Sequence, residues 1–584
     1  MPVEFMPVDL DVERREDGTL VLRSRLPLGD YDPNLARAIA RRARDKGAAT
    51  ALGWRGDDGG WRTLSYRDFK AQVDAAATWL RQHLPPRSPV LIVAENGPAA
   101  ALMTVAAFSA GMIAAPVGPS VALVGPPFER LRHVLAKQRP AAAFLDSRPA
   151  FAPAAALLRE AGITVIAEQP DRLGGGMPLD ALRAQTPDPD IEAFIDGLDV
   201  DAPAQYMLTS GSTGLPKVVP HSLRMLAANL AQGVASIGRA AGWDQDMLDW
   251  LPWHHAAGAS VLRACLVLGG TLYIDAGKPL PGLFEASIAN LRDRAVCYFN
   301  NVPAGFALLA DALEADAALR ATFFSKLRLM LYGGAGLPQP LYDRLQALAV
   351  ATTGRRVHMT TGYGMTETVS GCMTIHWPDT RVGIGLPPPA LAVKLVPNGA
   401  RYEVRLKGPS VMAGYLDEPA KNRAAFDDEG FYRTGDLAVF HDPQHPAQGL
   451  AFAGRMVEEF KLANGTWVPG GMLREALLKA LAGTVRELVL ADDGRPVLGM
   501  LAWAAPGVSL DAVAQALARF NAGQHGASTR IARVTLLASP PDPARHELSD
   551  KGSINRRAVL DNRADVVEAL FATPPGPDVR VLPA

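Results

Sequence analysis

Apolar segments that resemble strands alternate along this chain with apolar segments that resemble helices. The strand-like runs are 90–94, 142–145, 164–167 and 329–332, and the helix-like runs include 99–117, 150–161 and 306–319. Such alternation predicts parallel sheets whose two faces are covered by helices. Ligands of sheets like these bind beyond the carboxyl ends of the strands. The loops that follow the strands are therefore where we expect the functional residues.

The size and charge of the chain exclude several functional classes. With 584 residues the chain is long enough for more than one domain. Its 59 basic and 60 acidic residues nearly balance, which argues against nucleic acid or an anionic membrane as the main partner. The most apolar stretch, 99–117, contains Thr104, Ser109 and Gly111. We therefore expect it to be a buried helix and expect no membrane span.

The N-terminus and the cysteines indicate the compartment. Residues 1–16 are acidic and interrupted by prolines, unlike a signal peptide. Cys265, Cys297 and Cys372 lie far apart and lack a Cys-x-x-Cys spacing, so we expect buried thiols in a reducing environment. These features predict a cytoplasmic protein.

The pattern of the chain changes twice toward its C-terminus. From residue 392 to about 440, short strand-like runs predict a small β-rich layer. Beyond 455 we expect a helix at 472–482, strands at 489–491 and 499–503, a helix at 510–520 and a strand at 533–537. The predicted fold is therefore α/β, with a large N-terminal domain (1–455) of parallel-rich sheets flanked by helices plus the β-rich layer. A small α+β C-terminal domain (456–584) follows, with a loose tail from about 573.

A loop rich in glycine and hydroxyl groups, residues 209–217 with the sequence TSGSTGLPK, follows a strand-like run. Glycines let the backbone approach a ligand closely, and successive N–H groups in such a turn bind anions. The spacing differs from that of the common P-loop. Read alone, the segment is also compatible with a plain linker. The residues that we expect to hold a polyphosphate are Thr209, Ser210, Ser212, Thr213, Gly214 and Lys217.

Further motifs follow this loop in a fixed order. They are TGYGMTET at 361–368, YRTGD at 432–436, GR at 454–455 and DKGSINRR at 550–557. Together with the loop they resemble the core motifs of the adenylate-forming superfamily, which includes acyl-CoA synthetases, luciferases and peptide-synthetase adenylation domains. The resemblance covers nearly the whole chain. It implies ATP and Mg²⁺ as cofactors, coenzyme A as co-substrate, and a C-terminal domain that is mobile.

The resemblance assigns roles in the first domain that the residue chemistry supports. Glu367 is a hard oxygen ligand suited to Mg²⁺, and the hydroxyl of the adjacent Thr366 can reach a phosphate. Tyr363, followed by Gly364, has a flat face suited to stacking on adenine. Read alone, Glu367 could equally be a solvated carboxylate, and Tyr363 could be a core residue. The backbone of Gly334 and Ala335 is expected against the same base.

Two further positions are expected at the ribose. Asp436 resembles the family aspartate that accepts hydrogen bonds from both ribose hydroxyls, and Arg455 resembles the arginine that approaches ribose and phosphate. Without the resemblance, Asp436 would be assigned to local turn capping and Arg455 to an interdomain turn.

The C-terminal motifs imply a second set of roles. Lys551 resembles the lysine that bridges the acid carboxylate and the α-phosphate, although in isolation it would be a solvated surface lysine. Lys461 and Gly465 resemble the loop that lines the approach of the thiol. The hinge position, usually Asp or Lys, is Val457 here, and the loop 454–465 is one residue longer than is typical.

The acid is the least constrained substrate. His255, in the segment DWLPWHHAAG at 249–258, resembles the family histidine that faces the acyl pocket and acts in catalysis; its neighbours Trp253 and His254 are expected at that pocket. A structural role for either histidine stays open. Several longer runs, such as 298–303 and 460–467, resemble those of bacterial feruloyl-CoA synthases. On this basis Tyr298, Phe299, Asn301 and Gly333 are expected to line a slot for a phenolic ring, or to be a buried strand end. The small Ala256 and Ala257 depart from that subfamily.

We therefore predict an AMP-forming acid–CoA ligase that acts on ferulate or a related hydroxycinnamate, as in phenylpropanoid degradation. The partners are the small-molecule acid, ATP and CoA, and the enzyme is a monomer or homodimer. Three alternatives stay open: a ligase for another aromatic or aliphatic acid, an adenylation enzyme that loads a carrier protein, and a non-catalytic nucleotide-binding relative.

Overall fold

The structure of the chain is a computed structural model. It describes residues 5–123, 125–209, 215–280, 282–463, 467–491, 495–524, 526, 528–542, 545, 547–548 and 554–583. The chain divides into two compact units. The first unit comprises residues 1–398, 404–434 and 439–451, and the second comprises 399–403, 435–438 and 452–584.

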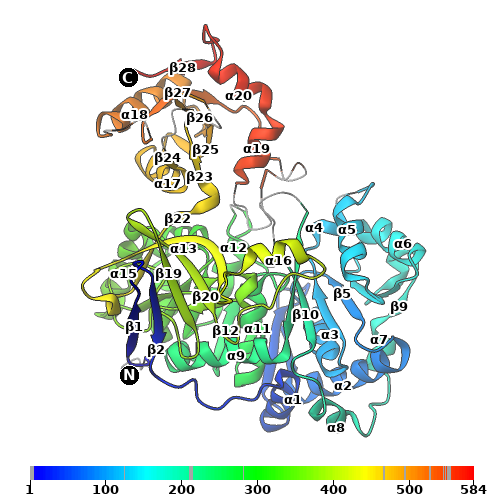
Figure 1. Cartoon of the computed structure of the whole chain (residues 1–584). Coiled ribbons are helices and arrows are strands. Elements are labelled where there is room, and N and C mark those ends of the chain that lie inside the picture. The colour runs from blue at the N-terminus through cyan, green and yellow to red at the C-terminus, as the bar shows by residue number, and fades with distance from the viewer. Residues whose placement is uncertain are drawn as a thin grey trace. The chain divides into compact units, whose positions relative to one another are not determined.

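A seven-stranded sheet in the first unit contains most of the predicted alternation. Its order is β11-β10-β6-β5-β7-β8-β9, with β5 Pro89–Val93, β6 Ile113–Pro116, β7 Ala142–Leu145, β8 Thr164–Ala167, β9 Met177–Pro178, β10 Pro203–Thr209 and β11 Lys217–Ser222. Neighbouring strands are parallel except at the β10–β11 edge. Helices α2 (Tyr66–His83), α3 (Pro98–Ser109), α5 (Glu129–Gln138) and α6 (Ala152–Glu160) surround β5 (Figure 1). Alternate side chains of β5 pack on α2 and α3, or on α5 and α6. The expected helix-covered parallel sheet is confirmed.

Two smaller sheets complete the α/β part of this unit. One has the order β12-β13-β3-β4, with β3 Thr50–Arg55, β4 Trp61–Ser65, β12 Asp246–Asp249 and β13 Thr271–Ile274. The other is the parallel sheet β14-β15-β16, with β14 Tyr298–Asn301, β15 Leu329–Tyr332 and β16 His358–Thr361. Three helices, α13 (Pro303–Ala315), α14 (Ala317–Lys326) and α15 (Gln339–Thr353), pack with β14 and β15 in one apolar core.

The remaining helices of the first unit are α1 Leu35–Lys46, α4 Ser120–Leu123, α7 Leu179–Arg183, α8 Ile191–Asp196, α9 Leu223–Gly233, α10 Arg239–Ala241, α11 Ala256–Leu268, α12 Glu285–Asp293, α13 Pro303–Ala315, α14 Ala317–Lys326, α15 Gln339–Thr353 and α16 Pro419–Ala425. The predicted helix at 306–319 is in fact α13 and α14. Asp316 separates them because its side chain accepts a hydrogen bond from the Leu319 N–H and so starts a new helix.

The single helix expected over 99–117 is wrong. Helix α3 ends at Ser109, Gly111 has a φ of 65°, and β6 begins at Ile113. A left-handed residue cannot continue a helix, and glycine adopts that conformation without strain. Continuous apolarity arises here because the helix and the parallel strand are each buried on all sides. Within the described residues, no helix is both long and apolar enough to cross a bilayer.

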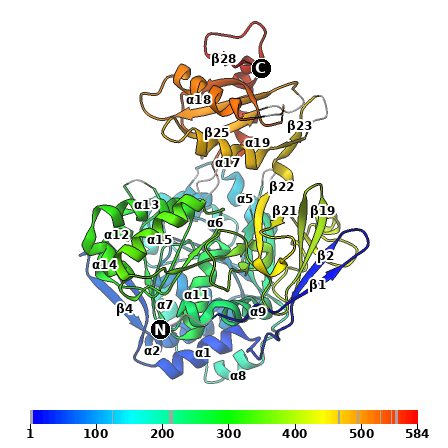
Figure 2. The same ribbon diagram turned by 90° about the vertical axis from the view of Figure 1, so that its left-hand side faces the viewer.

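A six-stranded sheet forms the predicted β-rich layer. Its order is β1-β2-β19-β20-β21-β22, with β1 Leu10–Arg14, β2 Leu20–Ser24, β19 Ala392–Asn398, β20 Arg401–Lys407, β21 Tyr432–Phe440 and β22 Leu450–Arg455. The N-terminal hairpin β1–β2 was not predicted to belong to it, yet β2 pairs antiparallel with β19 (Figure 2). A local sequence pattern cannot indicate that β2 pairs with a strand so far along the chain.

The second unit is built on the sheet β25-β26-β27-β28, with β25 Val485–Ala491, β26 Leu498–Ala504, β27 Ile531–Leu536 and β28 Val579–Val581. Its helices are α17 Gly470–Ala480, α18 Leu510–Ala522, α19 Arg556–Asn562 and α20 Ala564–Phe571, and a hairpin joins β23 Glu459–Lys461 to β24 Trp467–Pro469. The expected loose tail from 573 is not found, because β28 pairs antiparallel with β27 and Leu582 is buried in the core. Val579 and Leu582 supply the apolar side chains that hold this segment.

The three cysteines are free and buried, as expected. Cys265 lies in α11, and Cys297 directly precedes β14.

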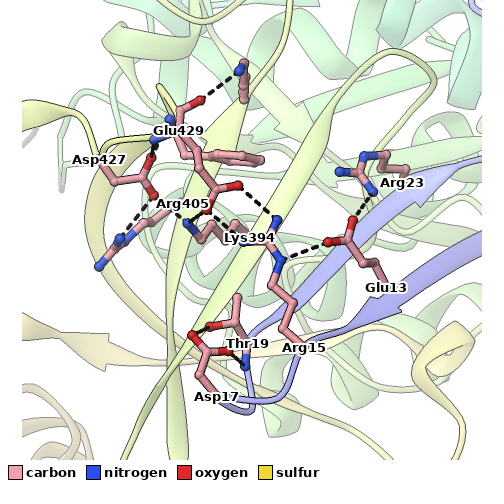
Figure 3. Close-up of polar contacts among 11 residues, drawn as sticks. Glu13, Arg15, Asp17, Thr19, Arg23, Lys394, Arg405, Asp427 and Glu429 are labelled. Carbon is pink, nitrogen blue, oxygen red and sulfur yellow. Dashed lines mark hydrogen bonds and ion pairs between the residues drawn. The ribbon is translucent and has the colours of Figure 1, made fainter.

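An ion-pair network ties the N-terminal hairpin to the loop before β21 (Figure 3). At its centre the Lys394 side chain, 9% exposed, donates hydrogen bonds to Asp427 (2.9 Å) and to Glu429. Glu429 in turn accepts two hydrogen bonds from Arg15 at 2.7 and 2.9 Å. Burial would raise the pKa of Asp427, but hydrogen bonds from Lys394, the Phe431 N–H and Arg405 outweigh it and lower the pKa to about 2. Hydrogen bonds from Arg15 and Lys394 lower the pKa of Glu429 to about 2.

We predict that this network makes stability depend on acid. Both carboxyls have folded-state pKa values below their ordinary values of 3.8 and 4.5, so their contribution is complete above those values and is lost as the pH falls toward 2. Lys394→Met should lower the thermal midpoint at pH 7 by roughly 5 °C and flatten its fall between pH 4.5 and 2. Scanning calorimetry over that range measures both effects.

The control for this prediction is Lys421→Met, which removes an exposed ion pair with Glu418 and should leave the midpoint nearly unchanged. An equally steep acid dependence in Lys394→Met and in the unaltered chain would show that the network is not its source.

Candidate active site

Several predicted residues gather at the carboxyl edge of the sheet β14-β15-β16. Asn301 ends β14, Gly333 follows β15, and Tyr363 follows β16. The Gly333 N–H donates to the Asn301 carbonyl at 3.3 Å, so neighbouring strand ends are joined directly. Gly334 has a φ of 79°, and both it and Ala335 are exposed. This edge therefore presents exposed backbone beside a half-exposed aromatic ring, as a base-binding site requires.

The turn after Tyr363 is tightly constrained. Strands β17 (Tyr363–Gly364) and β18 (Gly371–Met373) enclose the 3₁₀ turn η4 (Thr366–Thr368). A Cβ on Gly364 would lie 2.1 Å from the Ser370 carbonyl oxygen, so only glycine fits there. Val369 closes the turn at a φ of 69°, a strained conformation for a β-branched residue. Glu367 therefore lies in a turn whose backbone is constrained at both ends, at Gly364 and at Val369.

Glu367 is a buried carboxylate held by tyrosines. It is 6% exposed, and its Oε1 accepts a hydrogen bond of 2.8 Å from the Tyr415 hydroxyl. The Tyr415 and Tyr432 hydroxyl oxygens lie 3.3 Å apart. Burial, together with the charge of Glu367, raises the pKa of Tyr415, which therefore remains a donor. The Glu367 carbonyl accepts from the Met412 N–H at 2.8 Å, which joins η4 to the segment that carries Tyr415.

Lys217 contacts the aromatic ring of Tyr415. Its Nζ is 3.8 Å from the centroid of the Tyr415 ring, a cation–π contact. Lys217 begins β11 and pairs with Thr209, the last residue of β10, so the two ends of the loop 209–217 are side by side. Burial lowers the pKa of Lys217, and the carboxylate of Glu367 opposes that shift. Tyr415 thus contacts a buried anion through its hydroxyl and a partly buried cation through its ring.

The His255 segment is positioned by a strand end in the seven-stranded sheet. Asn96, which follows β5, accepts a hydrogen bond from the Trp253 N–H (2.9 Å) and donates to the Leu251 carbonyl (2.9 Å). His255 is the N-cap residue of α11, and its ring centroid is 4.4 Å from that of His254. Trp253 is buried, while both histidines are partly exposed. The pair is therefore accessible at the start of α11.

The residues expected to line a phenolic slot separate into two groups. Asn301 is buried, and its Oδ1 accepts from the Trp250 indole N–H at 3.1 Å, which links β14 to the His255 segment. Tyr298 is buried and packs edge-on against Trp243. Phe299 instead packs on Phe306 and Phe323 in the core of the α13–α15 layer. The structure does not bring Phe299 together with the other predicted residues.

The predicted ribose residues meet in the second unit. Arg455 Nε donates to Asp436 Oδ1 at 3.2 Å, and Asp436 is buried while Arg455 is exposed. The expected turn before Asp436 is not found: Gly435, at a φ of 74°, and Asp436 both lie within strand β21. A carboxylate and a guanidinium held together in this way offer both acceptors and donors to a polar ligand.

Several predicted residues lie outside the described residues. They are Ser210, Ser212, Thr213, Gly214, Gly465 and Lys551. Lys461 is described through its backbone, which pairs with Trp467 in the hairpin β23–β24. Within the described parts of the chain, no group of three or more histidine, cysteine, aspartate or glutamate side chains gathers as a metal cage.

Sequence reasoning missed three residues that position the site: Tyr415, Asn96 and His221. His221 Nε2 donates to the Thr366 carbonyl at 2.8 Å and so supports η4 from β11. Tyr415 follows Gly414, but a single aromatic after a glycine reads as core packing. Only the three-dimensional contact with Glu367 identifies it.

The model of a family described as AMP-binding enzyme matches residues 39–416. A long-chain-fatty-acid–CoA ligase of Thermus thermophilus is 29% identical over 294 residues, which are 46% of this chain and 50% of that protein. A 2-succinylbenzoate–CoA ligase of Bacillus licheniformis is 28% identical over 258 residues, 42% of this chain and 49% of that protein. The matched region spans about half the length of these curated relatives.

The fold is similar to solved structures over nearly the whole chain. The ATP-bound MatB of Rhodopseudomonas palustris superposes with a TM-score of 0.72 over 91% of this chain and 99% of that one, at 22% identity. At this identity the likeness concerns the fold.

We predict that Lys217 titrates below the ordinary lysine value of 10.5 and that Glu367→Gln lowers its pKa further. Burial disfavours the charged ammonium, and the variant removes the neighbouring negative charge that favours it. Reductive ¹³C-methylation followed by NMR titration measures the value, and Lys217→Arg assigns the signal. Glu314→Gln, which alters an exposed pair with Arg344, should leave the value unchanged. A rise in the Lys217 pKa in Glu367→Gln would contradict the arrangement.

Proposed function

Because the chain belongs to the AMP-binding enzyme family, we propose that it is an ATP-dependent, AMP-forming acid–CoA ligase. The observation that carries the proposal is the arrangement of Lys217, Tyr415 and Glu367. It sets a cation and a hard carboxylate around one ring at the mouth of the loop 209–217. Activation of a carboxylate by ATP needs a cation because the leaving group is a polyanion. It needs a hard carboxylate to hold the metal ion that accompanies ATP. The two curated relatives described above are CoA ligases by name, which supports the same reaction.

In the first step an oxygen of the acid carboxylate attacks the α-phosphorus of ATP. The bond to the β,γ-pyrophosphate breaks, and an acyl-adenylate forms. We propose that the loop 209–217, with Lys217, holds the β- and γ-phosphates and neutralises the departing pyrophosphate. The hydroxyl of Thr366 is placed by the same turn as Glu367 and reaches a phosphate oxygen. The adenine lies between Tyr363 and the exposed backbone of Gly334.

Glu367 fits a magnesium site. Mg²⁺ is usually held by one or two protein carboxylates, with the remaining positions taken by water and substrate phosphates, so the lack of a metal cage among the described residues does not conflict with it. The Tyr415 hydroxyl occupies one side of Oε1 and orients the carboxylate as a metal-supporting neighbour would. When bound, the ion would neutralise charge on the transferring phosphate oxygens.

In the second step the CoA thiol attacks the acyl carbon, the bond to AMP breaks, and the thioester leaves. We propose that residues 456–584 form a mobile domain and that Asp436 with Arg455 binds the ribose close to the point where that domain begins. Lys551 would serve the adenylation step, and Lys461 with Gly465 would line the path of the thiol. One site used twice requires a domain that presents different loops in each step.

For the acid we propose ferulate or a related hydroxycinnamate. The resemblance of the runs around Trp250, Tyr298 and Phe460 to feruloyl-CoA synthases supports this choice. The Asn301–Trp250 hydrogen bond supports it too, because it places an amide beside the His255 segment. The small Ala256 and Ala257, which depart from those enzymes, favour a bulkier acid of the same class.

The test is acid-dependent ATP–pyrophosphate exchange over cinnamates, benzoates and fatty acids, followed by addition of CoA. We expect exchange to be fastest with hydroxycinnamates and CoA to release AMP with the thioester. Glu367→Gln should lower the exchange rate by roughly 100-fold. Glu314→Gln, which changes an exposed ion pair with Arg344, should not. An absence of exchange with every acid would refute the ligase proposal, and exchange without thioester would favour a carrier-loading enzyme.

Lys551→Ala separates the two steps. It should abolish exchange and spare thioester formation from supplied acyl-AMP, because its proposed contact exists only during adenylation. Rapid-quench measurement of each half-reaction tests this prediction. Equal loss of both would contradict a two-conformation mechanism.

A further inference from the structure

A buried guanidinium without a matching anion lies in helix α11. Arg263 is 4% exposed, and in the described part of the chain its one hydrogen bond runs from Nη1 to the Gln205 side-chain oxygen at 3.4 Å. No described carboxylate forms an ion pair with it. Burial lowers the pKa of Arg263 to about 9, so it is still charged at neutral pH. A guanidinium has five N–H donors, and burying it without an acceptor is costly.

The imidazole of His221, a second buried group near Arg263, has a hydrogen-bond acceptor without a described partner. His221 pairs with Gln205 across β10 and β11, and its Nε2–H donates to the Thr366 carbonyl. Burial lowers the pKa of His221 to about 4, with a smaller contribution from the charge of Arg263, so the ring is neutral. With the proton on Nε2, Nδ1 is an acceptor, and it is buried with no partner among the described residues. Donors and an acceptor are therefore gathered at one place.

The position of Arg263 relates this cluster to the acyl end of the site. Helix α11 begins after His255, and Ala257 in its first turn is exposed. Ser260, half-exposed, has its hydroxyl 3.1 Å from that of Ser370, which follows η4. Arg263 is one turn further along the same side of the helix. The helical rise puts its Cα about 12 Å along the helix axis from that of His255.

We propose that Arg263, with Gln205 and His221, binds the end of the acid that is remote from the reacting carboxylate. The group recognised is an oxygen that accepts hydrogen bonds, carried either by a phenolic hydroxyl or by a second carboxylate. A phenolic hydroxyl would accept from Arg263 and donate to His221 Nδ1, whereas a carboxylate would match the guanidinium charge. This inference rests on the proposed ligase function and adds the substrate class to it.

The alternative is that Arg263 only supports the packing of α11 against β10. A packing role acts on every substrate alike, because it changes the position of the whole helix. Recognition acts only on acids that carry the remote oxygen. The two roles are therefore distinguished by comparing acids and not by the loss of activity alone.

The experiment measures kcat/KM in ATP–pyrophosphate exchange with 4-hydroxycinnamate, 4-carboxycinnamate and 4-methylcinnamate. The unaltered enzyme should prefer at least one of the two oxygen-bearing acids over the 4-methyl acid by about tenfold or more. Arg263→Met should abolish that preference without changing the KM for ATP, and Arg263→Lys should retain part of it. Whichever of the hydroxy and carboxy acids is preferred identifies the source of the oxygen.

Arg42→Met is the matched control, since Arg42 donates to the Val267 carbonyl near the end of α11 and should not affect the preference. If Arg263→Met fails to fold by calorimetry, Gln205→Met tests the same cluster and should weaken the preference in the same direction. A common loss for all three acids in the Arg263 or Gln205 variant, or no preference in the unaltered enzyme, would overturn the proposal. Absence of exchange with every acid would instead refute the ligase function.

Discussion

The hydrogen bond from Tyr415 to Glu367 is the interaction on which the site depends. A carboxylate that is 6% exposed is unfavourable unless its oxygens are satisfied. Tyr415 meets that requirement, and its ring also contacts the ammonium of Lys217. The same side chain therefore orients the anion and packs against the cation, and the charge of Glu367 favours the charged form of Lys217.

The backbone around this contact explains how it is kept rigid. Gly364 permits a 2.1 Å approach that any Cβ would forbid, and Val369 holds a strained φ at the far end of the turn. His221 and Met412 bond the turn to two other segments through its carbonyl groups. Strain of this kind persists only where the surroundings fix it from several sides. The sheet edge and the segments bonded to it thus determine where the site residues lie. The few side chains at that edge determine which reactions the site can carry out.

Much of this could be predicted from the sequence, and the reasons differ between elements. The parallel sheets followed from the alternation of apolar runs, since burial on both faces leaves a continuous apolar signature in each strand. The same signature merged α3 and β6 into one predicted helix, because nothing in the periodicity marks a change of structure at Gly111. The motif around Glu367 was recognisable because its residues are consecutive. Tyr415 and the β2–β19 pairing were not, because contacts between distant segments leave no local pattern.

Lys217, which is partly buried, and Arg263, which is buried, show how charge identifies a ligand. Lys217 has Glu367 nearby, so its charge is partly balanced before any substrate arrives, and that balance suits a group that must bind and then release pyrophosphate. Among the described residues, Arg263 has only the amide oxygen of Gln205 as an acceptor, so most of its N–H donors have no described partner. A fold that keeps such a residue bears an energetic cost that an acceptor oxygen would relieve. The cost is reasonable if it provides discrimination, because an acid without that oxygen leaves the guanidinium unsatisfied. In the proposed reaction, the balanced pair of Lys217 and Glu367 serves the phosphates of ATP, and Arg263, which lacks such a balance, serves the remote end of the acid.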